Sequence, residues 1–335
     1  MEAENKKTDV FGTLGPSCED PDILRKMFLE GMTGIRINLS HVMLSDYAGK
    51  VEMVRDAAHD AGVEPKILID MQGPEIRTGS FDTQVILENN SEFILGSGGI
   101  PVDLKIISYL SKGAEVLLDD GKILAEVKEN KGDHAILTVK RGGTLTSRKS
   151  IAIKDTHIDM PALTENDLIN LKAARDLGIT GVMQPFVRNR KDLEDLREAC
   201  NRAGAEGIRV YAKIENKEGV DRAEDLMDHC DEIVIARGDL GNTMPLWELP
   251  KMQKKLSRIC RENKRPFMVV TEMLSSMINN PVPTRAEVSD IYNACLDGAS
   301  SVMVTGETAI GRYPVEVIRY LSRTVISVDT AGFLK

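Results

Sequence analysis

The chain has 335 residues, of which 42% are hydrophobic, 28% charged and 4% aromatic. This is the composition of a globular protein rather than of a disordered or fibrous chain, and the length suits one large domain with an insert or two ordinary domains. The formal net charge of -9 argues against nucleic acid or an anionic membrane as the main partner.

Short β-branched apolar runs alternate with longer helical patterns along the chain. Strands are predicted at 10–14, 35–39, 66–70, 180–184, 209–213, 231–236, 266–270 and 301–304. Helices are predicted between and after them, at 21–30, 45–61, 165–177, 191–203, 219–227, 250–263, 285–297 and 314–328. Eight such units imply a parallel sheet. Their number favours a closed (β/α)8 TIM barrel over an open doubly wound sheet.

Residues 79–157 interrupt this alternation with a period of two. Segments 114–118, 123–128 and 135–140 are predicted strands, and Asp120-Gly121 is a signal for a type I′ hairpin turn. We therefore predict an α/β fold: a TIM barrel made of residues 1–78 and 158–335, with a small antiparallel β-barrel domain, residues 79–157, inserted after strand three as a lid.

The cysteines give an indication of the cellular compartment. Five are present, an odd number, and no two form a Cys-x-x-Cys pair, so reduced thiols are expected rather than disulfides or a zinc site. The N-terminus has no apolar signal region, and no apolar run is long enough to span a membrane. We expect a soluble cytoplasmic protein.

Candidate site residues follow from the barrel geometry, because active groups of TIM barrels lie at the C-terminal strand ends. Alternation along a strand places Lys213 and Glu215 on one face, and Asp239 lies in the loop after the next strand. Two carboxylates with few other ligands suit Mg²⁺ or Mn²⁺. The alternative is a structural ion pair.

The ends of strands two and three carry a second polar group. Arg36, Asn38 and Ser40 share a face, and Asp70 closes strand three before a turn that carries Glu75 and further charge. Polar residues at ordinary strand ends and a solvated surface ion pair are the alternatives here.

Six motifs then resemble the pyruvate kinase family, in that family's order over nearly the whole chain. They are Arg36-Ile-Asn-Leu-Ser-His, Gln-Gly-Pro-Glu-Ile-Arg-Thr-Gly within 71–79, Lys213-Ile-Glu-Asn, Ala236-Arg-Gly-Asp-Leu-Gly, Pro283-Thr-Arg-Ala-Glu and Gly306-Glu-Thr-Ala. The resemblance implies phosphoryl transfer between phosphoenolpyruvate and ADP, with Mg²⁺ or Mn²⁺ and K⁺ as cofactors.

The resemblance also implies roles for individual residues. Glu215 and Asp239 resemble the divalent-metal ligands, and Lys213 and Arg36 the cations that neutralise the transferring phosphoryl group. The K⁺ site would consist of Asn38, Ser40, Asp70 and Met71, with Glu75 as the acidic residue typical of K⁺-dependent members. The nucleotide would be contacted by Arg77, His41 and Asn38. Gly238 and Asp239 would receive the substrate carboxylate, with Thr271 close to the enolate carbon.

The sequence departs from the family pattern around the substrate, where Gln72, Pro185, Thr243 and Glu272 replace the usual residues. Three hypotheses therefore stay open: a short pyruvate kinase, a paralogue that uses the same metal-enolate site on another small acid, and a non-catalytic protein. The chain ends after the eighth barrel helix, so the family's C-terminal effector domain is expected to be absent. A homo-oligomer is expected, with a dimer through the barrel helices as the candidate.

Overall fold

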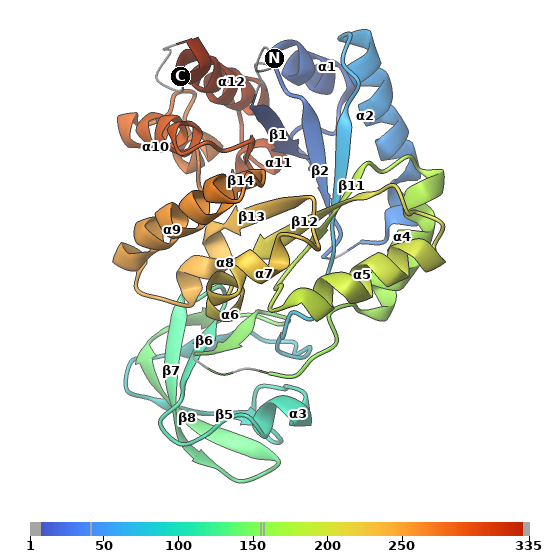
Figure 1. Ribbon diagram of the computed structural model, residues 1–335. Helices are drawn as coiled ribbons and strands as arrows, with labels where there is room; N and C mark the ends of the chain where they lie inside the picture. Colours follow the sequence, from blue (N-terminus) through green and yellow to red (C-terminus); the bar gives the residue numbers. More distant parts are fainter. Residues whose placement is uncertain (1–7, 41, 155, 157, 331–335) are drawn as a thin grey trace. The chain divides into compact units, whose positions relative to one another are not determined.

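The computed structural model describes residues 8–40, 42–154, 156 and 158–330. They divide into two compact units (Figure 1). The first unit contains the chain up to Gly73, Ala162–Gly241 and the chain from Leu246 onward, and the second contains Pro74–Pro161 and Asn242–Pro245. No helix among the described residues is long and apolar enough to cross a membrane.

Eight parallel strands close into a barrel in the first unit, which confirms the predicted TIM barrel. The strands are β1 (Asp9–Thr13), β2 (Gly34–Asn38), β3 (Lys66–Asp70), β11 (Gly181–Gln184), β12 (Arg209–Ile214), β13 (Glu232–Ala236), β14 (Phe267–Val270) and β15 (Ser301–Met303). Neighbouring strands pair in parallel, and pairing of β1 with β15 closes the ring.

Helices follow the barrel strands along the chain, as the alternating pattern predicts. They are α1 (Pro21–Leu29), α2 (Ala48–Asp60), α4 (Glu165–Asp176), α5 (Arg190–Arg202), α6 (Lys217–Asp221), α7 (Ala223–Leu226), α8 (Arg237–Asn242), α9 (Leu249–Glu262), α10 (Arg285–Leu296), α11 (Gly306–Ala309) and α12 (Pro314–Thr330). Short 3-10 helices are η1 (Leu44–Tyr47), η2 (Leu246–Glu248) and η3 (Ser275–Ile278). Local sequence explains several starts: Thr164 and Thr284 form capping boxes at α4 and α10.

Apolar side chains from all around the ring fill the barrel interior. The buried cluster is Phe11, Leu68, Met183, Tyr211, Val234, Ala236, Met268, Val270 and Met303. Two glycines make room for its rings, because a Cβ on Gly34 would lie 2.3 Å from the ring of Phe11, and one on Gly181 would lie 2.6 Å from the ring of Tyr211. The interior is thus a packed core, and polar chemistry is confined to the barrel ends.

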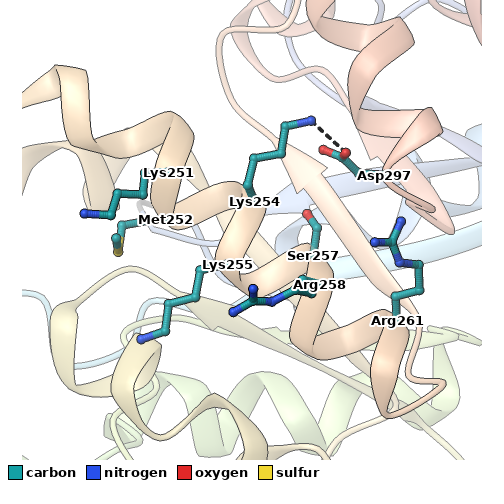
Figure 2. A pocket seen from close by; sticks show the side chains of 8 residues that line it. All are labelled: Lys251, Met252, Lys254, Lys255, Ser257, Arg258, Arg261 and Asp297. Atoms are coloured by element: carbon teal, nitrogen blue, oxygen red, sulfur yellow. Dashed lines mark hydrogen bonds and ion pairs between the residues drawn. The ribbon is translucent and has the colours of Figure 1, made fainter.

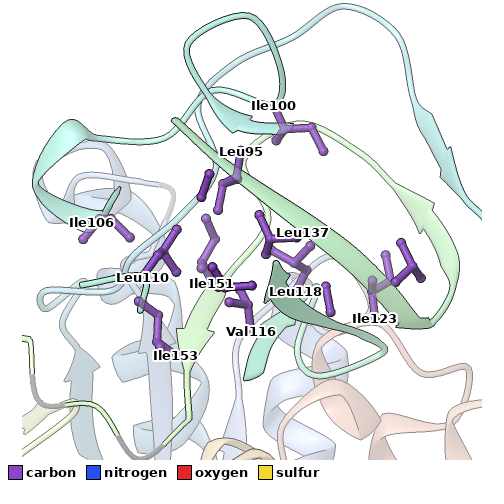
Figure 3. Close-up of a cluster of buried hydrophobic side chains, with 14 of the residues drawn as sticks. Leu95, Ile100, Ile106, Leu110, Val116, Leu118, Ile123, Leu137, Ile151 and Ile153 are labelled. Carbon is purple, nitrogen blue, oxygen red and sulfur yellow. The ribbon is translucent and has the colours of Figure 1, made fainter. Parts of the chain in front are cut away.

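The second unit consists of antiparallel β structure around its own core (Figure 3). Its elements are β4 (Val85–Leu87), β5 (Glu92–Gly96), α3 (Leu104–Ile107), β6 (Glu115–Leu118), β7 (Ile123–Asn130), β8 (His134–Arg141), β9 (Gly143–Leu145) and β10 (Ile151–Ile153). The strands form a five-stranded sheet and a two-stranded sheet in place of the small closed barrel that was expected. The reason is that β4 and β9, each three residues long, pair with one another and do not extend the larger ladder.

The hairpin between β6 and β7 has the turn that its sequence predicts. Asp120 and Gly121 have φ angles of 54° and 75°, as a type I′ turn requires at its two central residues. The N–H of Lys122 donates to the carbonyl of Asp119 at 3.1 Å and closes the turn.

The second unit begins before the predicted boundary at residue 79. The N–H of Ile151 donates to the carbonyl of Ile76 at 2.8 Å, and the N–H of Thr78 donates to the carbonyl of Lys149 at 2.8 Å. These bonds attach the turn after β3 to the inserted strands, so the compact unit begins at Pro74.

All five cysteines lie in the described part of the chain, are buried and form no disulfide. Burial raises the pKa of the Cys18 and Cys200 thiols to about 11 and that of the Cys230 and Cys260 thiols to about 12. Such thiols carry little thiolate at neutral pH and are poor nucleophiles.

Candidate active site

Charged side chains converge at the C-terminal ends of the barrel strands. Arg36 lies on β2, Asp70 ends β3, and Lys213 lies near the end of β12. Glu215 follows β12 directly, and Asp239 lies in the first turn of α8, immediately after β13. The strands that carry them are parallel, so their carboxyl ends meet at one face of the barrel, where active groups of this fold lie.

Asp70 binds both cations of this group. Its carboxylate accepts hydrogen bonds from Nε of Arg36 at 2.8 Å and from Nζ of Lys213 at 3.1 and 3.2 Å. Burial raises the pKa of Asp70, but Lys213 and Arg36 outweigh burial and hold the pKa below its ordinary value. Asp70 therefore stays ionised and fixes both cations.

Lys213 also contacts Glu215, with 2.9 Å between Nζ and Oε1. Burial lowers the pKa of Lys213, but Asp70 and Glu215 raise it above the ordinary value of a lysine. Lys213 is thus a permanent cation near neutral pH rather than a general base.

Glu215 is a carboxylate of this group whose charged form is disfavoured. Its side chain is 1% exposed and accepts a hydrogen bond from the backbone N–H of Phe186 at 2.8 Å. Burial raises the pKa of Glu215 to about 7, Lys213 opposes this rise, and the charges of Asp239 and Asp70 add to it. Burial and the neighbouring carboxylates therefore both favour the protonated form of Glu215.

The carboxylates of this group suit a divalent cation. Asp70, Glu215 and Asp239 are three carboxylates, whereas Arg36 and Lys213 are two cations. No group of three or more His, Cys, Asp or Glu side chains within the described ranges is placed to hold a metal. Glu215 and Asp239 could hold Mg²⁺, which commonly takes one or two carboxylates and completes its shell with water and substrate oxygens.

The residues predicted to bind K⁺ lie beside Asp70. Asn38 pairs with Asp70 in the β2–β3 register, and the hydroxyl of Ser40 donates to Oδ1 of Asn38 at 2.8 Å. Met71 is buried and follows Asp70 in the chain. His41, predicted to contact the nucleotide, lies outside the described residues.

Arg77, another predicted nucleotide contact, lies in the second unit. Its guanidinium forms an ion pair with Glu75 at 2.6 Å and donates to the carbonyl of Arg148 at 3.0 Å. Glu75 and Arg77 thus pair with each other, which is the ion pair considered above as the alternative interpretation of this turn.

Thr271 follows β14 in an unusual backbone conformation. Its φ is 82°, and Glu272 follows with 55°. A left-handed conformation is a genuine outlier for a β-branched residue such as Thr. Gly238 lies against it, because a Cβ on Gly238 would come within 3.0 Å of Cγ2 of Thr271.

The comparisons with known proteins agree with this geometry. The model of the pyruvate kinase barrel domain matches residues 5–318. This chain belongs to the pyruvate kinase family. It is 36% identical to the pyruvate kinase of Methylorubrum extorquens, covering 97% of this chain and 69% of that protein. It is 37% identical to the pyruvate kinase of Mycobacterium tuberculosis, over 97% of this chain and 70% of that protein. It is also 37% identical to the pyruvate kinase of Aeropyrum pernix, over 94% of this chain and 69% of that protein.

Two of the four residues that depart from the pyruvate kinase pattern, Gln72 and Pro185, have structural partners. Gln72 donates from Nε2 to the carbonyl of Ser40 at 3.3 Å, and Pro185 lies against Gly73, where a Cβ would come within 2.3 Å of its ring. Glu272 is exposed, so solvent screens the charge that it adds beside Thr271. Thr243 lies in the second unit.

Two largely buried side chains that hold loops of this pyruvate kinase family member were not among the predicted site residues. Asp167 is fully buried and accepts hydrogen bonds from the N–H groups of Gln72 and Gly73 at 2.8 and 3.1 Å. Arg237 donates to the carbonyl of Thr271 through Nε and a terminal nitrogen at 3.1 and 2.6 Å. The structure brings Arg237 and Thr271 together because Ala236 pairs with Val270 in the β13–β14 register, and no local sequence pattern shows that pairing.

A basic cavity of about 480 Å³ lies along α9, and none of the candidate site residues lines it (Figure 2). Four of its cations have acidic neighbours: Lys251 with Glu248, Lys254 with Asp297, Lys255 with Asp221 and Arg258 with Glu262. Its charge is therefore largely neutralised within the protein, whereas Arg36, Asp70 and Lys213 lie at the C-terminal ends of the barrel strands.

Proposed function

We propose that this chain transfers a phosphoryl group from phosphoenolpyruvate to ADP and gives pyruvate and ATP. The observation that carries the proposal is the buried network in which Asp70 fixes Lys213 and Arg36 beside the carboxylates of Glu215 and Asp239. Phosphoryl transfer requires positioning and charge neutralisation more than covalent chemistry, and this network supplies fixed charge.

Lys213 and Arg36 act on the transferring group. In the reaction the bond between phosphorus and the enol oxygen breaks, and a bond to a terminal phosphate oxygen of ADP forms. Negative charge is spread over the phosphoryl oxygens during this exchange. Because Asp70 already holds both cations, they need no reorganisation when this charge develops.

Glu215 and Asp239 are the proposed ligands of Mg²⁺ or Mn²⁺. When bound, this ion supplies further positive charge for phosphoryl and carboxylate oxygens. Asn38, Ser40, Asp70 and the carbonyl of Met71 are the proposed K⁺ ligands. In support, Asn38 and Ser40 share a hydrogen bond and Asn38 is in register with Asp70.

The remaining residues bind substrate and nucleotide. Gly238 and Asp239 lie in the first turn of α8, where backbone N–H groups lack intrahelical acceptors and can bind a carboxylate. Thr271 packs against Gly238, so its hydroxyl is the proposed group nearest the enolate carbon, which takes up a proton to give pyruvate. Arg77 and Asn38 are the proposed nucleotide contacts.

The test measures pyruvate formation from phosphoenolpyruvate and ADP with Mg²⁺ and K⁺ present. The expected result is turnover that disappears when the divalent cation is chelated and returns when it is added back. Absence of turnover above background in the folded protein would overturn the proposal. Metal-dependent proton exchange at the methyl group of pyruvate without kinase activity would favour a paralogue that acts on another acid.

We also propose a homo-oligomer in a reducing, cytoplasmic compartment. The large side chains of Leu246 and Trp247 are 71% and 81% exposed, which supports an apolar contact between copies of the chain. The five cysteines, which form no disulfide in the described residues, support a reducing compartment. Sedimentation at several protein concentrations tests the assembly, and a monomer throughout would contradict it.

A further inference from the structure

We propose that Arg237 is a positioning residue that holds Thr271 in its left-handed backbone conformation and so sets the direction of the Thr271 side chain. The inference rests on the proposed function for its catalytic consequence. Its structural part stands on the contacts of Arg237 alone.

The first observation is the backbone of the segment after β14. Thr271 and Glu272 have φ angles of 82° and 55°, and neither is a glycine. Such conformations are sparsely populated, persist where the surroundings enforce them, and gather at functional sites. Something in the structure must therefore hold this segment.

The second observation is the hydrogen bonding of the Thr271 carbonyl. Nε and one terminal nitrogen of Arg237 both donate to it, at 3.1 and 2.6 Å. Two donors of one planar guanidinium fix the direction of a carbonyl group more firmly than a single donor does. The peptide plane after Thr271 is thereby fixed from outside its own segment.

The third observation is that Arg237 is itself anchored. Its other terminal nitrogen donates to both carboxylate oxygens of Asp290 on α10, at 2.9 and 2.7 Å, and lies 3.4 Å from Oε1 of Gln253 on α9. The Arg237 side chain is 10% exposed. Few alternative positions are open to a buried guanidinium with this many partners.

These contacts connect the groups that the proposed reaction uses. Arg237 precedes Gly238 and Asp239, the proposed carboxylate and metal residues, and its side chain holds Thr271, whose Cγ2 lies against Gly238. One side chain thus couples the loop after β13 to the loop after β14. A small displacement of a positioned group can lower a rate by about 100-fold.

The test compares Arg237→Lys with Arg258→Lys, a matched change of an exposed arginine on α9. Arg237→Lys keeps a positive charge for Asp290 but loses the paired donors to the Thr271 carbonyl. We expect kcat for pyruvate formation to fall about 10- to 100-fold, while the KM for ADP changes little. Arg258→Lys should behave as the native chain does.

A double variant distinguishes positioning from general support of the fold. If Arg237 acts through Thr271, then Arg237→Lys added to Thr271→Ala should cause little further loss, because coupled residues are not additive. Losses that multiply, or a native kcat in Arg237→Lys, would overturn the proposal. If Arg237→Lys does not fold, Asp290→Asn takes its place, because it changes only the anchor of Arg237. Asp290→Asn should also lower kcat. A native kcat in Asp290→Asn would overturn the proposal.

Hydrogen exchange separates this inference from the proposed function. In the chain without substrates, amides around Thr271 and Glu272 should exchange faster in Arg237→Lys than in the native chain or in Arg258→Lys. If the native chain forms no pyruvate, the proposed function fails, but the exchange measurement still tests the positioning role of Arg237. Unchanged exchange at Thr271 and Glu272 in Arg237→Lys would refute that role.

Discussion

The carboxylate of Asp70 lies 3.1 Å from Nζ of Lys213, although 143 positions separate the two residues in the chain. The strand order brings them together, because β3 and β12 both flank β11. Asp70 therefore has a role besides that of a proposed K⁺ ligand. It is the group that keeps the two cations of the site charged and in place.

Replacing Asp70 with Asn should destabilise the protein and lower its activity. The change leaves Lys213 and Arg36 buried without their shared counter-ion, and breaking a buried pair in this way costs about 3–5 kcal/mol. Urea denaturation measures the free energy of unfolding. The control is Asp176→Asn, an exposed residue, which should stay within about 0.5 kcal/mol of the native value. Equal stability of both variants would refute the role of Asp70.

Lys213→Gln should reduce kcat by at least about 100-fold, the scale seen when one donor to a developing negative charge is removed. The fold should persist, because Glu215 can still accept the hydrogen bond from Phe186. Steady-state pyruvate formation measures kcat, and circular dichroism shows whether the fold persists. Lys251→Gln, at an exposed position on α9, serves as the control, and a near-native rate for Lys213→Gln would exclude Lys213 from the chemistry.

Glu215→Gln should weaken Mn²⁺ binding by more than about 10-fold. Substituting a residue that only supports a metal ligand already lowers metal affinity by about 10-fold or more, and Glu215 is itself a proposed ligand. Titration of Mn²⁺ followed by electron paramagnetic resonance measures binding without turnover. Glu198→Gln, on the exposed face of α5, should bind Mn²⁺ as the native chain does. Equal Mn²⁺ affinity of the two variants would place the metal elsewhere.

Glu232 is the first residue of β13 and so lies at the end of the barrel opposite the candidate active site. Its titration should make the free energy of unfolding depend on pH. Burial raises its pKa above the ordinary value, although Ser301, Arg209 and Ser300 oppose the rise. The folded state therefore binds this proton more tightly than the unfolded state. The contribution of Glu232 to stability is then fully present at pH values below its unfolded-state pKa of about 4.3. It is lost as the pH rises through the folded-state pKa of Glu232.

Glu232→Gln should remove this pH-dependent loss, because a glutamine side chain keeps an oxygen for the hydroxyls of Ser300 and Ser301 and carries no proton to lose. Denaturation curves at a series of pH values above about 4.3 give the comparison. Identical pH profiles for the native chain and the Glu232→Gln variant would show that Glu232 does not titrate as its burial indicates.

The barrel was predictable because its signal is local. Each strand is a short β-branched run with a helical pattern behind it, and β3 was predicted with the bounds that the structure has. Short strands of the insert, such as β9 and β10, were not predicted, because three residues are too few to show alternation.

The site was predictable in its residues and less so in its contacts. Alternation places Lys213 and Glu215 on one face, and the structure brings them together. No local pattern could show that Lys213 also reaches Asp70, because that contact depends on the order of strands around the closed barrel. The partners of Arg237 were hidden for a related reason: Gln253 and Asp290 lie on two separate helices.

The buried cysteines also make the chain suited to site-specific labelling. At neutral pH a maleimide reacts with exposed thiolates, whereas the native thiols are buried and largely protonated. One cysteine introduced at Asp176 in the barrel unit and another at Lys131 in the inserted unit would therefore carry dyes in an otherwise native background. Energy transfer between the dyes could then follow the separation of the two units through a catalytic cycle.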